Sequence, residues 1–360
     1  MADIFGALGL ADTDYAFVNT AGQSIVYDAT MQLLGDHNAD LAASEKVFVE
    51  QTTADHTVKF KLPSEGYLQR LGARSPAAAT KPNGGWNTSF TLEEFGAGIA
   101  WDRVTLAYMT VGQYRLTLDG ILRKDRNTRR QEMLRAIFNN AARTFKDENW
   151  PDLTIVPLAN GDSVLYPPVL GTIAEATANN YLVSGYASAS ISDTNDPIPT
   201  MVNALEQYLG TPTGGSKIAV FINNAETNSI RGLTNFDTVP NRFVEYGANV
   251  SLVPEDKFPA GLPGRVLGET DSALIVEWRW IPAGYMFATH LDAPQPLRRR
   301  IDPPAVGLGD GLQMIVEDMT NPIKTAQWSH RFGYGCCNRL NGVVMQLTTG
   351  SYTVPTLYNY

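Results

Sequence analysis

The sequence is poor in cysteine and in long apolar runs, and each shortage excludes a class of protein. Its two cysteines, Cys336 and Cys337, are adjacent, and adjacent residues of a strand point to opposite faces. We therefore expect no disulfide between them, and a chain made in a reducing cytoplasm. No apolar run approaches the roughly 20 residues that a membrane span needs. Residues 1–17 lack the basic region of a signal peptide, so we expect neither a membrane segment nor a secretory leader.

Positive charge is also scarce. The chain has 28 Lys and Arg against 37 Asp and Glu, which gives a net charge of -9. Affinity for nucleic acid comes mostly from cations that contact phosphate, so the composition does not favour a nucleic-acid-binding protein. Basic runs at 129–130 and 298–300 are the exceptions. Such runs ordinarily lie on solvated faces or on faces that contact another subunit.

No stretch carries a recognisable catalytic or metal-binding motif. Residues 210–217, GTPTGGSK, resemble a phosphate loop, but Lys and Ser are swapped, and a helix precedes the loop where a strand should. His37, His56, His290 and His330 do not have metal-ligand spacing, and there is no Gly-x-Ser-x-Gly elbow. We therefore predict a protein that is not an enzyme, with no cofactor and no metal site.

The most prominent pattern that is present is one long amphipathic segment. Residues 113–149 contain no proline, and apolar side chains such as Leu118, Leu122 and Phe138 recur at helical spacing. Pro151 follows and ends the pattern. The segment predicts a helix on the order of 50 Å long, which is more than a small core needs, in a chain that otherwise reads as mostly β.

The segments before and after this helix have strand patterns. Residues 57–62 alternate strictly between apolar and polar, and residues 88–95 can return beside them after a loose tip at 70–85. A lone hairpin is marginally stable, so we expect a neighbouring molecule to support it. The further predicted elements are helices at 28–41, 198–209 and 225–233 and strands at 46–50, 217–222, 249–253, 265–267, 273–280, 285–290, 312–317, 326–332 and 343–347.

The order of these elements resembles the major capsid protein of tailed bacteriophages, the Hong Kong phage-type fold that encapsulins share. Residues 264–268 (GRVLG), 277–284 (EWRWIPAG), 328–335 (WSHRFGYG) and 338–344 (NRLNGVV) are similar to the closing strands of that family. The resemblance covers nearly the whole chain. It implies an α+β fold with a long β-hairpin extended loop, a spine helix, and peripheral and axial domains.

The resemblance also implies a domain order and a function. It places an N-terminal arm at 1–45, the extended loop at 46–110, the spine helix and peripheral domain at 111–164, the axial domain at 165–300 and the completion of the peripheral domain at 301–360. Copies of the chain would form the hexamers and pentamers of an icosahedral virion shell. That shell would assemble in the host bacterial cytoplasm and enclose double-stranded DNA without sequence-specific binding.

Other proteins are expected to assist this assembly. Because no N-terminal scaffolding segment is recognisable, the resemblance implies a separate scaffolding protein, together with a portal and, as a further candidate, a decoration protein. We predict that cations pair with charges on neighbouring subunits, although isolated surface pairs contribute little. The candidates are Lys59, Lys61, Arg70 and Arg74 in the hairpin, Arg123, Lys124, Arg129 and Arg130 on the long helix, and Arg298, Arg299 and Arg300.

Some relatives cross-link a lysine of the extended loop to an asparagine of a neighbour. The candidate donors here are Lys59, Lys61 and Lys81, and the candidate acceptors are Asn338 and Asn341. The reaction also needs a desolvated lysine beside a glutamate, which a sequence does not show, so we favour subunits without cross-links.

Two other functions stay open. A shell protein of a cellular compartment, like an encapsulin, would have the same fold and would load a cargo enzyme. A soluble α/β enzyme without a recognisable motif would instead bind a small molecule, most simply in the segment 165–300.

Overall fold

A computed structural model of the chain describes most of its residues and divides it into two compact units. The described residues are 16–61, 68, 70, 85–148, 150–159, 161, 164–212, 218–238, 262–270, 273–316, 323 and 325–359. Unit 1 consists of the residues up to Glu45, Thr91–Met133 and Arg300–Gly333, and unit 2 of Lys46–Phe90, Leu134–Arg299 and Tyr334–Tyr360. Each unit is described by itself.

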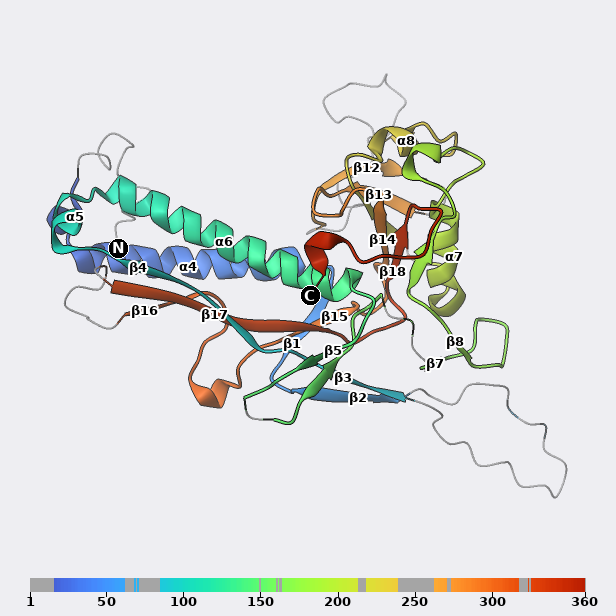
Figure 1. Cartoon of the computed structure of the whole chain (residues 1–360), viewed down its shortest axis with the longest axis horizontal. Coiled ribbons are helices and arrows are strands. Elements are labelled where there is room, and N and C mark those ends of the chain that lie inside the picture. The colour runs from blue at the N-terminus through green and yellow to red at the C-terminus, as the bar shows by residue number, and fades with distance from the viewer. Residues whose placement is uncertain are drawn as a thin grey trace. The chain divides into compact units, whose positions relative to one another are not determined.

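Helices and runs of strands follow one another along the chain (Figure 1). The helices are α3 (Val18–Ala21), α4 (Gln23–Glu45), α5 (Arg103–Tyr108), α6 (Val111–Phe138), α7 (Ile198–Leu209) and α8 (Thr227–Arg231), with 3-10 turns at Ser188–Ser190, Pro304–Val306 and Thr356–Tyr358. The strands are β1 (Val49–Thr53), β2 (Thr57–Lys61), β3 (Gly85–Ser89), β4 (Glu93–Ala100), β5 (Arg143–Phe145), β6 (Leu153–Ile155), β7 (Leu165–Tyr166), β8 (Ala176–Thr177), β9 (Tyr181–Val183), β10 (Ile218–Ile222), β11 (Asp237–Thr238), β12 (Arg265–Glu269), β13 (Ala273–Glu277), β14 (Tyr285–His290), β15 (Leu297–Arg300), β16 (Gln313–Val316), β17 (Thr325–Cys336) and β18 (Val343–Gln346).

Unit 1 is built from two long helices on an antiparallel sheet. Strand β17 pairs with β16 on one edge and with β4 on the other, so that Trp328 lies opposite Met314 and Ala97. Helices α4 and α6 run beside each other along this sheet (Figure 1). The shared core consists of Val18, Val26, Leu34, Leu106, Met109, Val111, Tyr114, Leu118, Ile121, Leu122, Leu312, Met314, Ile323, Ala326 and Trp328.

The start of α6 is set by a capping box. The side chain of Thr110 accepts a hydrogen bond from the backbone N–H of Gln113, and the side chain of Gln113 accepts one from the backbone N–H of Thr110, each at 3.2 Å. This reciprocal arrangement satisfies two backbone donors that the first turn of a helix leaves without partners. The buried positions Tyr114, Leu118 and Leu122 then follow at helical spacing.

Unit 2 contains a mixed seven-stranded sheet in the order β11-β12-β13-β10-β14-β18-β9. Strand β10 is parallel to β13 and antiparallel to β14, and every residue of β10 is buried. A strand buried on both faces needs an apolar run without alternation, which explains the sequence Ile218–Ile222. Helix α7 packs on this sheet through Met201, Val202 and Leu205. Smaller antiparallel pairs in unit 2 join β2 to β3, β5 to β6 and β7 to β8.

The predicted α+β class is confirmed, but the predicted long helix is too long at its C-terminal end. Helix α6 ends at Phe138. The side chain of Asn139 then accepts a hydrogen bond from the backbone N–H of Ala141 at 3.3 Å, a turn in which asparagine competes with helix. The residues after it form β5, which pairs with β6.

The predicted return strand at 88–95 is also wrong, because the chain uses two strands there. Strand β3 pairs with β2, whereas β4 pairs with β17. Of the other predicted elements, the helix at 198–209 and the strands at 217–222 and 343–347 are confirmed to within a residue or two. The tip at 70–85 and the strand at 249–253 lie almost wholly outside the described residues.

Candidate functional site

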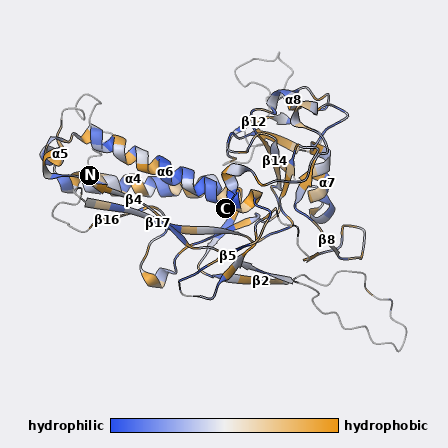
Figure 2. Ribbon diagram, viewed as in Figure 1, coloured by the Kyte–Doolittle hydropathy of each residue, from blue (hydrophilic) through white to orange (hydrophobic). Residues whose placement is uncertain are grey.

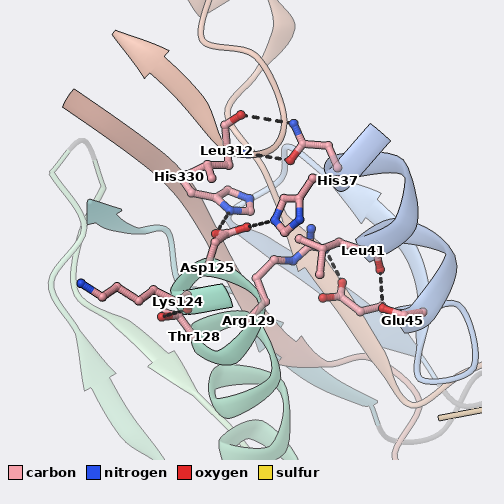
Figure 3. A network of polar contacts seen from close by, with 11 residues as sticks. His37, Leu41, Glu45, Lys124, Asp125, Thr128, Arg129, Leu312 and His330 are labelled. Carbon is pink, nitrogen blue, oxygen red and sulfur yellow. Dashed lines mark hydrogen bonds and ion pairs between the residues drawn. The ribbon is translucent and has the colours of Figure 1, made fainter. Parts of the chain in front are cut away.

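Three side chains from separate elements meet inside unit 1 (Figure 3). His37 on α4 and His330 on β17 both contact the carboxylate of Asp125 on α6. Nε2 of His37 lies 2.9 Å from Oδ2, and Nδ1 of His330 lies 2.6 Å from Oδ1. Because an ionised carboxylate only accepts hydrogen bonds, each of these nitrogens carries a proton. All three residues are buried, so the network joins both helices to the sheet from within.

The ionisation of Asp125 depends on this network. Burial alone would raise its pKa, but the hydrogen bonds from His330 and His37 outweigh burial and lower that pKa to about 2. Asp125 is therefore charged over the whole physiological range. The interaction is structural, because the carboxylate has both oxygens engaged.

One turn further along α6, Arg129 donates a hydrogen bond from Nη2 to Oε2 of Glu45 at the end of α4. Its guanidinium also lies 5.9 Å from the ring centroid of Phe332 on β17. Arg129 is only 1% exposed. The structure thus holds this predicted subunit contact within its own chain, and a role between subunits stays a prediction.

Sequence reading missed Glu45 and the joint role of His37, Asp125 and His330. The residues that α4 buries are Val26, Thr30, Leu34, His37, Leu41 and Glu45. Every second one is polar, although all of them have the spacing of buried helix positions. Polar residues at core positions were the signal that could have revealed a buried network. The partner of His37 could not be inferred from the sequence, because Asp125 is 88 residues away from it.

The other predicted cations of α6 differ in their surroundings. Arg123 and Lys124 are exposed, whereas Arg130 is partly buried. Burial, and then the nearby charge of Arg126, lower the pKa of Arg130. Arg126 and Arg130 therefore bring like charges close together on α6, part of which Figure 2 shows in the blue of hydrophilic residues.

In unit 2, two arginines flank an aromatic pair near the loop end of strands β2 and β3. Phe60 and Trp86 lie directly opposite each other, with ring centroids 5.6 Å apart and nearly parallel planes. The guanidinium of Arg298 lies 5.8 Å from the Phe60 ring, and that of Arg339 lies 5.9 Å from the Trp86 ring. Arg298 also pairs with Glu50 at 3.0 Å. Cation–π and aromatic contacts together therefore position this end of the β2–β3 strand pair.

The remaining predicted contact residues differ in their exposure to solvent. Lys59 and Arg70 are exposed, whereas Arg299 and Arg300 are buried. Lys61 ends β2. Arg74 and the cross-link candidate Lys81 lie outside the described residues, as does the side chain of Lys61.

The two predicted cross-link acceptors are unlike each other. Asn341 is 1% exposed; its Oδ1 accepts hydrogen bonds from Thr289 and from the backbone of His290, and its Nδ2 donates to the carbonyls of His290 and Pro294. Its amide carbon is therefore inaccessible to another chain in this conformation. Asn338 is partly exposed and donates to the carbonyl of Pro294 at 2.7 Å.

The described residues contain neither a metal-binding cluster nor a membrane-spanning helix. No three His, Cys, Asp or Glu side chains are grouped so as to hold a metal ion there. In the same part of the chain, no helix is both long and apolar enough to cross a membrane.

Solved structures show the fold of the chain. No known family profile matches it, and no curated protein is similar in sequence. A structure from Mycobacterium phage Patience matches 97% of this chain and 94% of its own, at 19% identity and a TM-score of 0.67. The mature capsid of bacteriophage PhiM1 matches 84% of this chain and 86% of its own, at 8% identity and a TM-score of 0.50. The chain therefore has the fold of a phage major capsid protein.

Proposed function

We propose that this protein is the major capsid protein of a tailed double-stranded DNA bacteriophage, and that its copies form the hexamers and pentamers of an icosahedral head. The observation that carries the proposal is the fold, which is similar to a phage structure over 97% of the chain. The location of the protein is then the virion shell, after assembly in the host cytoplasm.

A structural role fits the described residues better than a catalytic one. The buried ionisable network of unit 1 connects elements, and both carboxylate oxygens of Asp125 are engaged. Arg123 and Lys124 of α6 are exposed, and a neighbouring subunit would cover them. The proposal therefore gives the protein no enzymatic activity and places its function in contacts between subunits.

The proposal extends to domains and partners. The segment 46–110, which contains the β2–β3 hairpin, is the extended loop, and 111–164 holds the spine helix α6 and the first part of the peripheral domain. The segment 165–300 is the axial domain, and 301–360 completes the peripheral domain. A separate scaffolding protein, a portal and a decoration protein are the proposed partners. The net charge of -9 supports a shell that encloses DNA without holding it tightly.

The test is the size and shape of the assembled protein. The chain is expressed in bacteria alone and with its candidate scaffolding protein, and each preparation is examined by sedimentation velocity and negative-stain electron microscopy. Closed shells or flat hexameric sheets are expected. A compact monomer under both conditions would overturn the proposal and favour the enzyme alternative, while shells that enclose a cargo protein would favour a cellular compartment.

A further inference from the structure

The solvent face of α6 carries cations that unit 1 does not neutralise. Arg123 and Lys124 are exposed. They follow Gly120 by three and four residues, so they lie one helical turn beyond it on the same face. Arg126 lies on the flank of the same face. None of these three cations has an ion-pair partner among the residues that the structure describes. We call this surface, together with Leu116, the cationic face.

Helix α4 carries the opposite charge. It contains no lysine or arginine, and Asp28, Asp36 and Asp40 are all exposed. Within the described part of the chain, these carboxylates have no ion-pair partner either. We call this surface, together with Met31 and Gly35, the acidic face. Unit 1 therefore presents two faces of opposite sign that it does not use internally.

Each face has a glycine in the middle of its helix. Glycine is the least favourable helix residue apart from proline, so Gly35 and Gly120 need a reason. A Cβ added at either position would meet nothing within 4 Å, so packing within the chain does not explain them. Close approach of another backbone is a common reason for a glycine. Both positions therefore point to a partner helix that comes near.

The two glycines have similar surroundings. Leu116 precedes Gly120 by four residues and is 73% exposed, and Met31 precedes Gly35 by four residues and is 42% exposed. Residues four apart lie on one face of a helix. Each face therefore combines an exposed apolar side chain and a gap where a side chain would be with an excess of one charge. On the cationic face, the half-exposed Asp119 lies beside Arg123 and offsets part of the positive charge.

We propose that the cationic face of one copy packs against the acidic face of a second copy. The inference rests on the proposed capsid function and names the surfaces that join neighbouring subunits. Two different faces of one chain make a head-to-tail contact, which repeats into rings or extended arrays, as a shell requires. Charge complementarity fixes the partner and the orientation.

A second copy accounts for more of the surface than other partners do. DNA or an acidic scaffolding protein would neutralise Arg123 and Lys124 but would leave Asp28, Asp36 and Gly35 unexplained. A second copy uses all of them. The alternatives are separated by the experiments below.

The first experiment fills the gap at each glycine. Gly120→Leu and Gly35→Leu place a bulky side chain in open space, so the melting temperature of the monomer should stay the same or rise, because leucine favours helix. Shell or sheet formation should be lost. Asn203→Leu, at an exposed position of α7 in unit 2, is the matched control and should assemble normally. Normal assembly of both glycine variants would overturn the proposal.

The second experiment uses charge reversal and mixing. One variant carries Arg123→Glu and Lys124→Glu, and the other carries Asp28→Lys and Asp36→Lys. Each alone presents two faces of like charge and should stay small in sedimentation velocity. An equimolar mixture restores opposite charges at every contact between unlike copies and should recover large assemblies. This recovery occurs only between molecules, so it is independent of any attraction between α4 and α6 within one chain.

The outcomes are distinct from failure of the capsid assignment. If the wild-type chain forms shells but the mixture of variants does not recover assembly, the capsid function stands and the proposed contact is wrong. If only the α6 variant loses assembly, and only in the presence of scaffolding protein or DNA, the cationic face binds that partner and the second-copy proposal is overturned. If the wild-type chain never assembles, the proposed function itself fails.

Discussion

At the scale of single residues, unit 1 owes its arrangement to buried charges that are paired. Asp125 joins α6 to α4 and β17 through His37 and His330, and Arg129 joins α6 to α4 through Glu45. Removing one member of a buried pair leaves the other charge unpaired, which costs about 3–5 kcal/mol. These residues therefore hold the fold, while Arg123 and Lys124 are available for contacts.

Asp125 should make the protein sensitive to acid. Its pKa is lowered from 3.8 to about 2 in the folded protein, so the unfolded chain binds a proton first as the pH falls. The resulting stabilisation, about 2 kcal/mol, is fully present above roughly pH 5 and is lost as the pH falls through the folded pKa. Asp125→Asn lacks this contribution. Urea unfolding of the monomer should show a difference between wild type and variant that shrinks by about 2 kcal/mol from pH 6 to pH 2. A difference that does not change with pH would contradict this account of the network.

Charge reversal at two positions of α6 should have different effects on stability. Arg129→Glu places a carboxylate against Glu45 in a buried site and should lower the free energy of unfolding by about 3–5 kcal/mol. Arg123→Glu changes an exposed residue and should alter it by less than about 0.5 kcal/mol. Thermal unfolding of the two soluble variants is the measurement. Equal melting temperatures would show that Arg129 is not structurally paired.

At the scale of elements, the sequence is informative wherever burial sets the pattern. The apolar run of β10 and the amphipathic α7 were predicted closely, because a core imposes their periodicity. The end of α6 was missed because Phe145 fits a strand as well as a helix, and the stop signal was the side chain of Asn139. The break after β3 was missed although the apolar positions shift there, from Phe90 and Leu92 to Phe95, and β4 has a different partner strand.

The hairpin formed by β2 and β3 depends on the aromatic pair Phe60 and Trp86. Trp86→Ala removes the ring that faces Phe60 and Arg339, and such aromatic pairs contribute about 0.5–1.5 kcal/mol. Amide hydrogen exchange in β2 and β3 should therefore accelerate, while exchange in β10 stays unchanged. Tyr108→Ala, at an exposed position of α5, is the control and should alter neither strand pair. Unchanged exchange in β2 after Trp86→Ala would show that the aromatic pair is dispensable.

At the scale of the whole molecule, the fold could be predicted from the order of elements, but the contact surfaces could not. Arg129 and Arg299 looked like surface cations and are buried, and Asn341 looked available and is not. Burial of a charged side chain depends on partners far away in sequence, such as Glu45 for Arg129. Only the folded chain shows which charges it leaves for other molecules.

The same reasoning predicts subunits without covalent cross-links. Asn341 is inaccessible, and Lys59 is exposed to water, whereas the reaction requires a desolvated amine. Boiled particles on a denaturing gel should give a single band near 39.3 kDa. A ladder of bands at multiples of the subunit mass would contradict this prediction. If the ladder were then missing from Asn338→Ala particles, Asn338 would be the acceptor.

The measurement that tests the central claim most directly is electron cryomicroscopy of the purified assembly. The account predicts a closed icosahedral shell whose wall consists of fivefold and sixfold clusters of this chain. Both units of the chain should fit within the density of every subunit. Particles without such symmetry, or a protein that remains a monomer with its scaffolding partner present, would contradict it.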